Sequence, residues 1–443
     1  MAELKAFKGV RYASAGELAQ LVCPPYDIIS PEDQARLHAL HPNNAIRLEL
    51  PAVERRAGSA GPQDKTGAGS AGPQDKTGAG SAGPQNETGA GGDYARVAQV
   101  FGDWLDQGVL KTEDRDSLYI HRQDFRDGSG ARRTVTGVLG ALTLEASGPG
   151  AGVLPHERTM AGPVADRLAL LRASPVNISP IYAIYKGSGS LGPYFDSLED
   201  RPPSSRFVTG DHDLQRLWVI SAPAELEMLS EALAVTPLVI ADGHHRYETA
   251  LAYRAEQGAR PGGHDAILCL CVDADVEDVM VLPYHRALSS ATPPETLRRR
   301  LERDWGATGV PDDEVTGALE ASEAAHPFVF LLPGGPLLVE ISASEAGRLL
   351  GGRAQAARAL HVVVLHEGLL PRLFVEGATE LRFMRDASDV AAMVDSGASD
   401  AGVLLRGLRP GQIVDAAQTG ERMPEKASYF WPKALTGLVL RPL

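Results

Sequence analysis

One stretch, TPLVIADGHHRYETAL at 236–251, limits the folds open to this chain more than any other feature of its sequence. Its apolar first part ends at Ala241 and has the length of a buried strand. Residues with helical spacing follow from His245, and Gly258 can end that helix. A strand that passes directly into a helix is a unit of mixed α and β folds, so the pattern predicts such a fold with residues 242–246 at the corner.

The corner sequence, DGHHR, has the residue types that bind a phosphate group. The first backbone N–H groups of a helix have no partner within the helix and carry partial positive charge, so they attract anions. Gly243 lets the backbone bend and approach a ligand, and His244, His245 and Arg246 can donate hydrogen bonds to phosphate oxygens. Asp242 can hold a metal ion or orient an imidazole. The alternative is structural: Asp242 caps the helix, and the histidines are ordinary surface or core residues.

A second polar cluster lies upstream in VLPHERTMAGPVADRLALLRASP. Leu154 can end a strand and Pro163 can begin an amphipathic helix. His156, Glu157 and Thr159 therefore fall in the connection before a helix. A carboxylate held there against a phosphate site can take a proton from an attacking hydroxyl group. The alternative is that Glu157 only pairs with the neighbouring arginine or caps the helix.

The chain divides into three predicted regions: 1–150, 151–290 and 291–443. In the first, the repeat AGSAGPQDKTG starts at Ala57 and Ala68 and recurs in altered form at Ala79. A tract so rich in Gly, Ser and Pro cannot bury a core, so we expect a disordered surface insertion at 57–92.

Local patterns predict the remaining elements. We expect short strands at 21–30 and 43–50, a helix at 31–40 with Ser30 as its N-cap, a helix at 93–108, a hairpin of 116–125 with 132–145, a helix at 295–304, and strands at 326–335 and 335–342. The closing segment ASYFWPKALTGLVL is expected to dock on the body of the protein. Arg47 and Arg286 stand at expected strand positions, from which they can reach the site and bind a carboxylate or phosphate; ordinary salt bridges are the alternative.

Charge and cysteine content narrow the classes of partner. The formal net charge of −14, from 57 acidic and 43 basic residues, argues against nucleic acid as a partner. No run of about 18 apolar residues and no apolar leader is present, so we expect no membrane span. Three scattered cysteines fit a reducing compartment. We therefore expect a soluble cytoplasmic protein.

The two polar clusters together resemble a known arrangement. The LPHE motif, followed by DRLALLRASPVNISPIYAIYKG and then VIADGHHRYETALAYRAEQG, resembles the ParB/sulfiredoxin superfamily and its free-serine kinases, whose corner is similar. Outside the repeat, nearly the whole chain resembles domain-of-unknown-function family 1015, through CPPYDIIS, NNAIRLEL, LPHERT, IADGHHRYETAL, LPYHRAL and SYFWPKALTGLVL. The resemblance implies an α+β fold with a ParB/sulfiredoxin-like nucleotide-binding core, at 151–290, embedded in a larger chain.

The resemblance also implies roles for the residues. Glu157 would be the base on an acceptor hydroxyl, and nucleotide phosphates would bind at Gly243, His244, His245 and Arg246. Asp242 would assist metal or serine binding. His156 and Thr159 stand beside the base and are expected to contribute to nucleotide binding. His244 and Asp242 are expected to be catalytic residues. The corner lacks the Gly-Glu-Arg-Arg form of the DNA-binding branch and the Gly-Cys-His-Arg form of sulfiredoxin, so no catalytic cysteine is expected there.

The function predicted from the sequence is phosphoryl transfer from ATP or ADP, with Mg²⁺, to the hydroxyl of a small molecule such as free serine. Two alternatives remain open: a nucleotide-hydrolysing switch that recruits a protein partner, and a non-catalytic binding module. The sequence does not identify the donor nucleotide, the acceptor or the oligomeric state.

Overall fold

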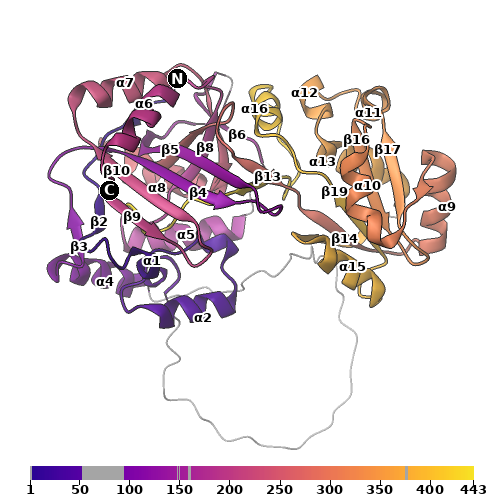
Figure 1. Ribbon diagram of the computed structural model, residues 1–443, viewed down its shortest axis with the longest axis horizontal. Coiled ribbons are helices and arrows are strands. Elements are labelled where there is room, and N and C mark those ends of the chain that lie inside the picture. The colour runs from indigo at the N-terminus through magenta and orange to yellow at the C-terminus, as the bar shows by residue number, and fades with distance from the viewer. Residues whose placement is uncertain (1, 52–93, 147, 149, 158–160, 375–377) are drawn as a thin grey trace, which may run out of the picture.

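The structure is a computed structural model that describes residues 2–51, 94–146, 148, 150–157, 161–374 and 378–443. It has two lobes, each built on its own β-sheet (Figure 1). The predicted insertion at 57–92 lies outside the described residues. Helices and strands are mixed in both lobes, which confirms the predicted α+β fold class.

The larger lobe is built on a nine-stranded mixed sheet, in the order β6-β11-β8-β12-β5-β4-β10-β9, with β1 beside β5. Its strands are β1 (Leu4–Lys5), β4 (Leu118–Arg126), β5 (Arg132–Thr143), β6 (Val153–Pro155), β8 (Ile181–Tyr185), β9 (Ser205–Val208), β10 (Leu214–Ile220), β11 (Leu238–Asp242) and β12 (Ala266–Asp273). Strands β6 and β11 are parallel neighbours, so their carboxyl ends lie at the same edge. The polar cluster at His156 and Glu157 follows β6, and the DGHHR corner lies at the end of β11.

Helices and short pairs of strands surround this sheet. They are α1 (Leu18–Leu21), the 3₁₀ turn η1 (Tyr26–Ile28), α2 (Pro31–Leu40), α3 (Ile46–Glu49), α4 (Tyr94–Asp106), α5 (Ala161–Ala173), α6 (Gly192–Ser197), η2 (Leu198–Asp200), α7 (Pro223–Ala234), α8 (His244–Gln257) and η3 (Gly263–Asp265), with β2 (Val10–Tyr12) paired to β3 (Leu110–Thr112) and β7 (Val176–Asn177) to β21 (Arg441–Pro442). Alternate residues of the central strands enter different apolar clusters. Ile181 and Cys269 pack with Leu229 of α7, whereas Tyr182 and Leu268 join the cluster that contains α4 and α5.

The smaller lobe is built on a six-stranded sheet, in the order β15-β17-β16-β19-β14-β18, whose neighbouring strands are antiparallel. Its elements are β14 (His285–Ser290), α9 (Pro294–Trp305), β15 (Thr308–Gly309), η4 (Asp312–Glu314), α10 (Val315–Ala321), β16 (His326–Leu331), β17 (Leu337–Ile341), α11 (Ala343–Leu349), α12 (Gln355–Arg358), α13 (His361–Val363), the π-helical η5 (Val364–Leu369), α14 (Leu370–Leu373), β18 (Ala378–Met384), α15 (Ala387–Asp395), β19 (Ala401–Leu405) and α16 (Pro410–Gln418). The chain then returns to the larger lobe, pairing β20 (Tyr429–Trp431) with β13 (Met280–Leu282) on the way.

Most elements predicted from local pattern are confirmed. Helix α2 begins after Ser30, whose Oγ accepts a hydrogen bond from the Asp33 N–H at 3.1 Å. The hairpin β4–β5, helices α4 and α9, and strands β16 and β17 lie where expected. The closing aromatic segment docks as predicted, with Tyr429 and Phe430 buried.

The strands predicted at 21–30 and 43–50 are wrong. Residues 26–28 form the 3₁₀ turn η1, and residues 46–49 form the helical turn α3. Asn44 accepts a hydrogen bond from the Ile46 N–H at 2.9 Å through its side chain, which starts the turn. Three of the four α3 residues are buried, so an alternating apolar pattern this short is satisfied by one helical turn as well as by a strand.

The two predicted region boundaries, at 150 and 290, differ in how they relate to the two sheets. The one at 150 lies within the larger sheet, because β1, β4 and β5 precede it and β6 and β8 to β12 follow it. The one at 290 lies at the end of β14, the first strand of the smaller sheet along the chain.

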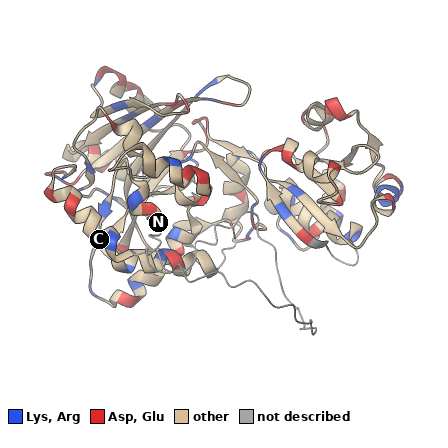
Figure 2. Cartoon of the chain, turned by 90° about the horizontal axis from the view of Figure 1, so that it is seen from below, with Lys and Arg blue, Asp and Glu red and all other residues tan. Residues whose placement is uncertain are grey.

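Charges of both signs are interspersed along both lobes (Figure 2). The arginines of α9 share the helix with acidic residues, and Arg298 and Arg303 each have an acidic partner. Within the described ranges, every helix is too short or too polar to cross a bilayer.

Candidate functional site

The predicted corner exists as a sharp turn between β11 and α8. Gly243 has a φ of 88° and a ψ of 28°, in the left-handed region that L side chains rarely adopt. A Cβ at this position would lie 2.9 Å from Ile181 Cγ2 and 3.0 Å from Arg246 Nε. Both the backbone angles and the close packing therefore require glycine here, and the turn brings the first residues of α8 to the end of the strand.

Asp242 lies between two cations. Its Oδ2 accepts a hydrogen bond from Arg246 Nη2 at 2.8 Å, and its Oδ1 accepts one from Lys433 Nζ at 2.6 Å. Burial acts to raise the pKa of the Asp242 carboxyl, but the charges of Lys433 and Arg246 outweigh it and hold the pKa well below its usual value. One carboxylate therefore lies between two cations at the start of α8, where the helix dipole adds positive potential, and the charges of Asp27 and Glu49 also act on Arg246.

Arg246 is buried and donates to the Pro180 carbonyl oxygen as well as to Asp242. Its Nε has no hydrogen-bond partner, although it is buried. Burial acts to lower the pKa of Arg246, but the charge of Asp242, together with those of Asp27, Tyr26 and Glu49, outweighs it, so the guanidinium stays protonated. Arg246 therefore fixes the turn and keeps one donor beside Gly243.

The histidines of the two clusters meet at this edge of the sheet. His156 Nδ1 lies 2.5 Å from the Ile240 carbonyl oxygen, and its Nε2 lies 3.0 Å from Ser428 Oγ. A carbonyl only accepts, so Nδ1 of His156 carries the proton. The backbone N–H of His156 donates to His244 Nε2 at 3.4 Å, and the two ring centroids are 4.6 Å apart.

All three histidines are neutral near pH 7. Burial lowers the pKa of His156 to about 4 and lowers the pKa of His244 well below its usual value. Burial also lowers the pKa of His245, in the first turn of α8. They can orient and donate single hydrogen bonds, while the positive charge beside Asp242 comes from Arg246 and Lys433.

Glu157 lies two residues beyond the end of β6, in the same site. Its Oε1 accepts a hydrogen bond from the Lys426 backbone N–H at 3.1 Å. Burial raises the pKa of the Glu157 carboxyl to about 7, although the N–H and the ammonium of Lys426 both act to lower it. A carboxyl group with a pKa near neutrality has the basicity that general-base catalysis at pH 7 needs.

Arg286 lies in this site and comes from the smaller lobe, whereas Arg47 contacts the backbone of α2. Arg286 is fully buried and donates to the Lys426 carbonyl oxygen at 3.1 Å; burial lowers its pKa to about 9, against the charge of Glu157. Arg47 lies on α3 and donates to the His38 carbonyl oxygen at 2.8 Å. The acidic residue of that turn, Glu49, is the one whose charge acts on Arg246. Thr159 lies outside the described residues.

The C-terminal segment supplies residues that the sequence motifs missed. Lys426 contacts Glu157, Ser428 contacts His156 and Lys433 contacts Asp242. The sequence predicts that the segment ASYFWPKALTGLVL docks on the protein body. Lys426 and Lys433, on either side of its aromatic residues, are the sequence feature that could have pointed to a role in the site.

The donor set fits an anion better than a metal ion. Both oxygens of Asp242 already pair with cations, and no group of three or more metal-ligating side chains occurs among the residues that the structure describes. Asp242 as a ligand of Mg²⁺ therefore does not fit this arrangement. A phosphate group does fit, because the first turn of α8, the cations Arg246 and Lys433 and the partnerless Arg246 Nε all belong to this corner.

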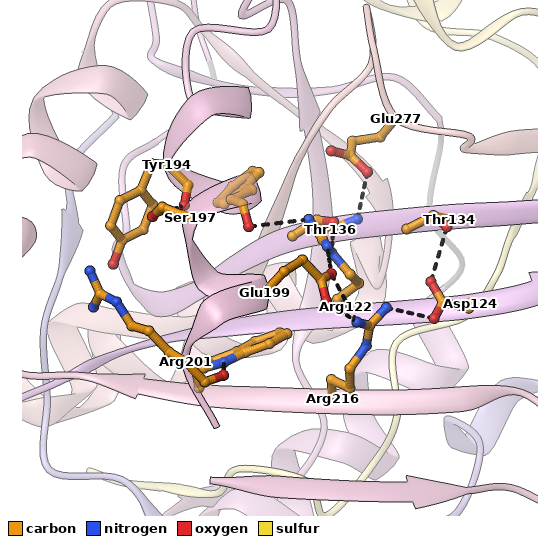
Figure 3. Close-up of polar contacts among 12 residues, drawn as sticks. Arg122, Asp124, Thr134, Thr136, Tyr194, Ser197, Glu199, Arg201, Arg216 and Glu277 are labelled. Carbon is orange, nitrogen blue, oxygen red and sulfur yellow. Dashed lines mark hydrogen bonds and ion pairs between the residues drawn. The ribbon is translucent and has the colours of Figure 1, made fainter. Parts of the chain in front are cut away.

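A separate group of charged side chains, around β4, β5 and β10, has a structural role (Figure 3). Glu199 pairs with both Arg122 and Arg216, and Arg216 also pairs with Asp124 at 2.6 Å. Glu277 accepts a hydrogen bond from the Thr136 N–H at 2.6 Å. The ion pairs of this cluster thus join strands β4 and β10 to each other and to Glu199 on η2.

Comparison with known proteins identifies a family. A free serine kinase in complex with AMP has 15% identity and a TM-score of 0.32 over 63% of this chain and 83% of its own. SbnI with C-terminal truncation, from Staphylococcus aureus, has 11% identity and a TM-score of 0.36 over 67% and 85%. A conserved hypothetical protein from Pyrococcus furiosus has 14% identity and a TM-score of 0.32 over 64% and 89%.

No curated protein matches the chain. Since these TM-scores are low, a function for this protein has to be argued from its own residues. The family model described as Protein of unknown function (DUF1015) matches residues 4–67 and 79–362, which is most of the sequence. The chain therefore belongs to the DUF1015 family.

Proposed function

We propose that this protein transfers a phosphoryl group from a nucleotide to the hydroxyl group of a small molecule. One observation carries the proposal: a carboxylate whose pKa burial raises to about 7, Glu157, follows β6, and the anion-attracting corner follows the parallel neighbour β11. A base and a phosphate site side by side are the two parts that such a transfer needs.

Each part has a defined role in the reaction. The first turn of α8, with His245 and Arg246, holds the phosphates of ATP or ADP, while Lys433 and Arg246 supply positive charge. The acceptor oxygen attacks the terminal phosphorus, and the bond from that phosphorus to the bridging oxygen breaks. The shortened nucleotide leaves with the bonding electron pair, and Glu157 takes the hydroxyl proton.

The metal has no assigned ligand in this reaction. Because both oxygens of Asp242 are paired with cations, Asp242 is proposed to orient Lys433 and Arg246. His156 and His244 are proposed to hold the edge of the site in place. Free serine is the first acceptor to test, on the strength of the motif resemblance, and the proposed compartment is the cytoplasm.

A product screen tests the proposal. Purified protein is mixed with Mg²⁺ and ATP, ADP or CTP in turn, together with a pool of hydroxy amino acids, and phosphorylated products are followed by mass. The expected result is one phosphorylated amino acid that disappears in Glu157→Gln and persists in Glu227→Gln, a matched change at an exposed position on α7. Nucleotide hydrolysis without a phosphorylated product would instead favour the switch, and no consumption of nucleotide would refute an enzymatic role.

A further inference from the structure

Lys426 has an unusual backbone conformation next to the proposed base. Its φ is 53°, one of three positive values among the non-glycine residues that the structure describes. Such a conformation costs free energy for a side chain with a Cβ, so it persists only where surrounding contacts impose it. The segment around it lies along the end of β6, where the Met423 N–H donates to the His156 carbonyl oxygen at 2.8 Å.

Both backbone polar groups of Lys426 have partners within the site. Its N–H donates to Glu157 Oε1 at 3.1 Å, and its carbonyl oxygen accepts from Arg286 Nη2 at 3.1 Å. Arg286 is itself fixed, because its Nε lies 2.9 Å from His366 Nε2 in the smaller lobe. Lys426 is therefore held between the base on one lobe and a buried guanidinium on the other.

The ammonium group of Lys426 remains close to the base. Its Nζ lies 5.5 Å from the centre of the Tyr284 ring, and no carboxylate lies within ion-pair distance of it among the described residues. Its charge nevertheless acts on Glu157 and on His245. The backbone contact and the ammonium thus favour the same form of the carboxyl group, the ionised one.

We propose that Lys426 is a positioning residue that holds the Glu157 carboxylate in place and in its ionised form, so that docking of the C-terminal segment completes the base. The catalytic part of this inference rests on the function proposed above, since it assigns Glu157 a proton to remove. The electrostatic part concerns the resting protein alone.

Several other charged or titratable groups face Glu157. They are Asp242 on β11, Glu425 in the C-terminal segment, and Tyr284 and Arg286 at β14. Asp242 and Glu425 oppose ionisation of Glu157, and they act together with burial to raise its pKa. Removing the ammonium of Lys426 should therefore raise the pKa of Glu157 further.

Substitutions of Lys426 distinguish the effect of its ammonium group from that of its backbone N–H. Lys426→Gly keeps the N–H and suits a positive φ, so it should not lower the melting temperature. Lys426→Arg keeps the charge. Lys426→Gln provides a second neutral variant, in case the glycine variant fails to fold, and Lys111→Gln, at an exposed position on β3, controls for the change in net charge.

Titration of Glu157 by ¹³C NMR is the test, in protein labelled at the glutamate carboxyl carbon. The Glu157 signal is assigned by its absence in Glu157→Gln. We expect the midpoint to rise by about one pH unit in Lys426→Gly and Lys426→Gln, and to stay at the wild-type value in Lys426→Arg and Lys111→Gln. The acid limb of the rate profile should move by the same amount.

An unchanged midpoint in both neutral variants would overturn the inference and leave Lys426 a structural residue. The titration needs no substrate, so it gives a result even if the product screen detects no phosphoryl transfer. A shifted midpoint in a protein without transferase activity would uphold the electrostatic role of Lys426 and refute the proposed function separately.

Discussion

Lys433→Met tests whether the ion pair at the corner is as important as its burial suggests. Lys433 Nζ lies 2.6 Å from Asp242 Oδ1, and the two side chains are only 8% and 15% exposed. Methionine replaces the lysine at similar volume and removes the charge. Among the residues that the structure describes, Arg246 would then be the one remaining ion-pair partner of the buried Asp242 carboxylate.

The expected cost follows from the burial of the pair. Breaking a buried ion pair by removing one partner costs about 3–5 kcal/mol, and since Arg246 stays in place we expect about 2–3 kcal/mol. A matched exposed pair is available in the same chain: Lys186 Nζ lies 2.5 Å from Asp415 Oδ1, with side chains 36% and 52% exposed. Lys186→Met should cost less than about 1 kcal/mol, because water screens that pair.

The assay is urea unfolding at pH 7, followed by tryptophan fluorescence. Asp242→Asn in the Lys433→Met background should cost further stability, because it leaves the buried guanidinium of Arg246 without this carboxylate. The pKa of Asp242 is depressed in the folded state, so its contribution is present at pH 7 and is lost as the pH falls through the folded pKa. If Lys433→Met costs no more than Lys186→Met, the reasoning about this corner is refuted.

Two further predictions concern the corner. Gly243→Ala should lower the free energy of unfolding by about 1–3 kcal/mol more than Gly258→Ala does, because both glycines have positive φ but only Gly243 lacks room for a Cβ; equal losses in urea unfolding would contradict the packing argument. His245→Ala should weaken nucleotide binding about tenfold by calorimetry, whereas His264→Ala, on η3, should leave it unchanged; an unaltered affinity in His245→Ala would remove His245 from the phosphate site.

The sequence reveals those parts of the site that depend on local structure. The turn at Gly243 follows from a strand-length apolar run, a glycine and a helical pattern within about twenty residues. Glu157 is found in the same way, because it lies in the connection just after a short strand. The parallel pairing of β6 with β11 then brings these two places together.

The residues that complete the site depend on distant pairing. Lys426 is 269 residues from Glu157, and Lys433 is 191 residues from Asp242. No periodicity in a single sequence records contacts over such separations. For the same reason, Asp242 could be interpreted as a metal ligand from its residue type, whereas its partners in the folded chain are two cations.

The strand predicted at 43–50 is wrong for a different reason. Residues of this segment alternate in a way that fits a strand, but Asn44 starts a helical turn through its side chain. The turn directs Arg47 to the His38 carbonyl oxygen and buries Glu49. Short apolar runs satisfy either structure, and the neighbouring chain decides between them.

The measurement that tests the central claim most directly is single-turnover phosphoryl transfer in the wild-type protein and in Glu157→Gln, with nucleotide affinity measured in both. Because burial raises the pKa of Glu157 to about 7 and the base must be deprotonated, the wild-type rate should fall as the pH drops below about 7. Glu157→Gln should bind nucleotide with unchanged affinity and react about 10²-fold more slowly or worse. A variant that transfers phosphate at the wild-type rate would contradict the account.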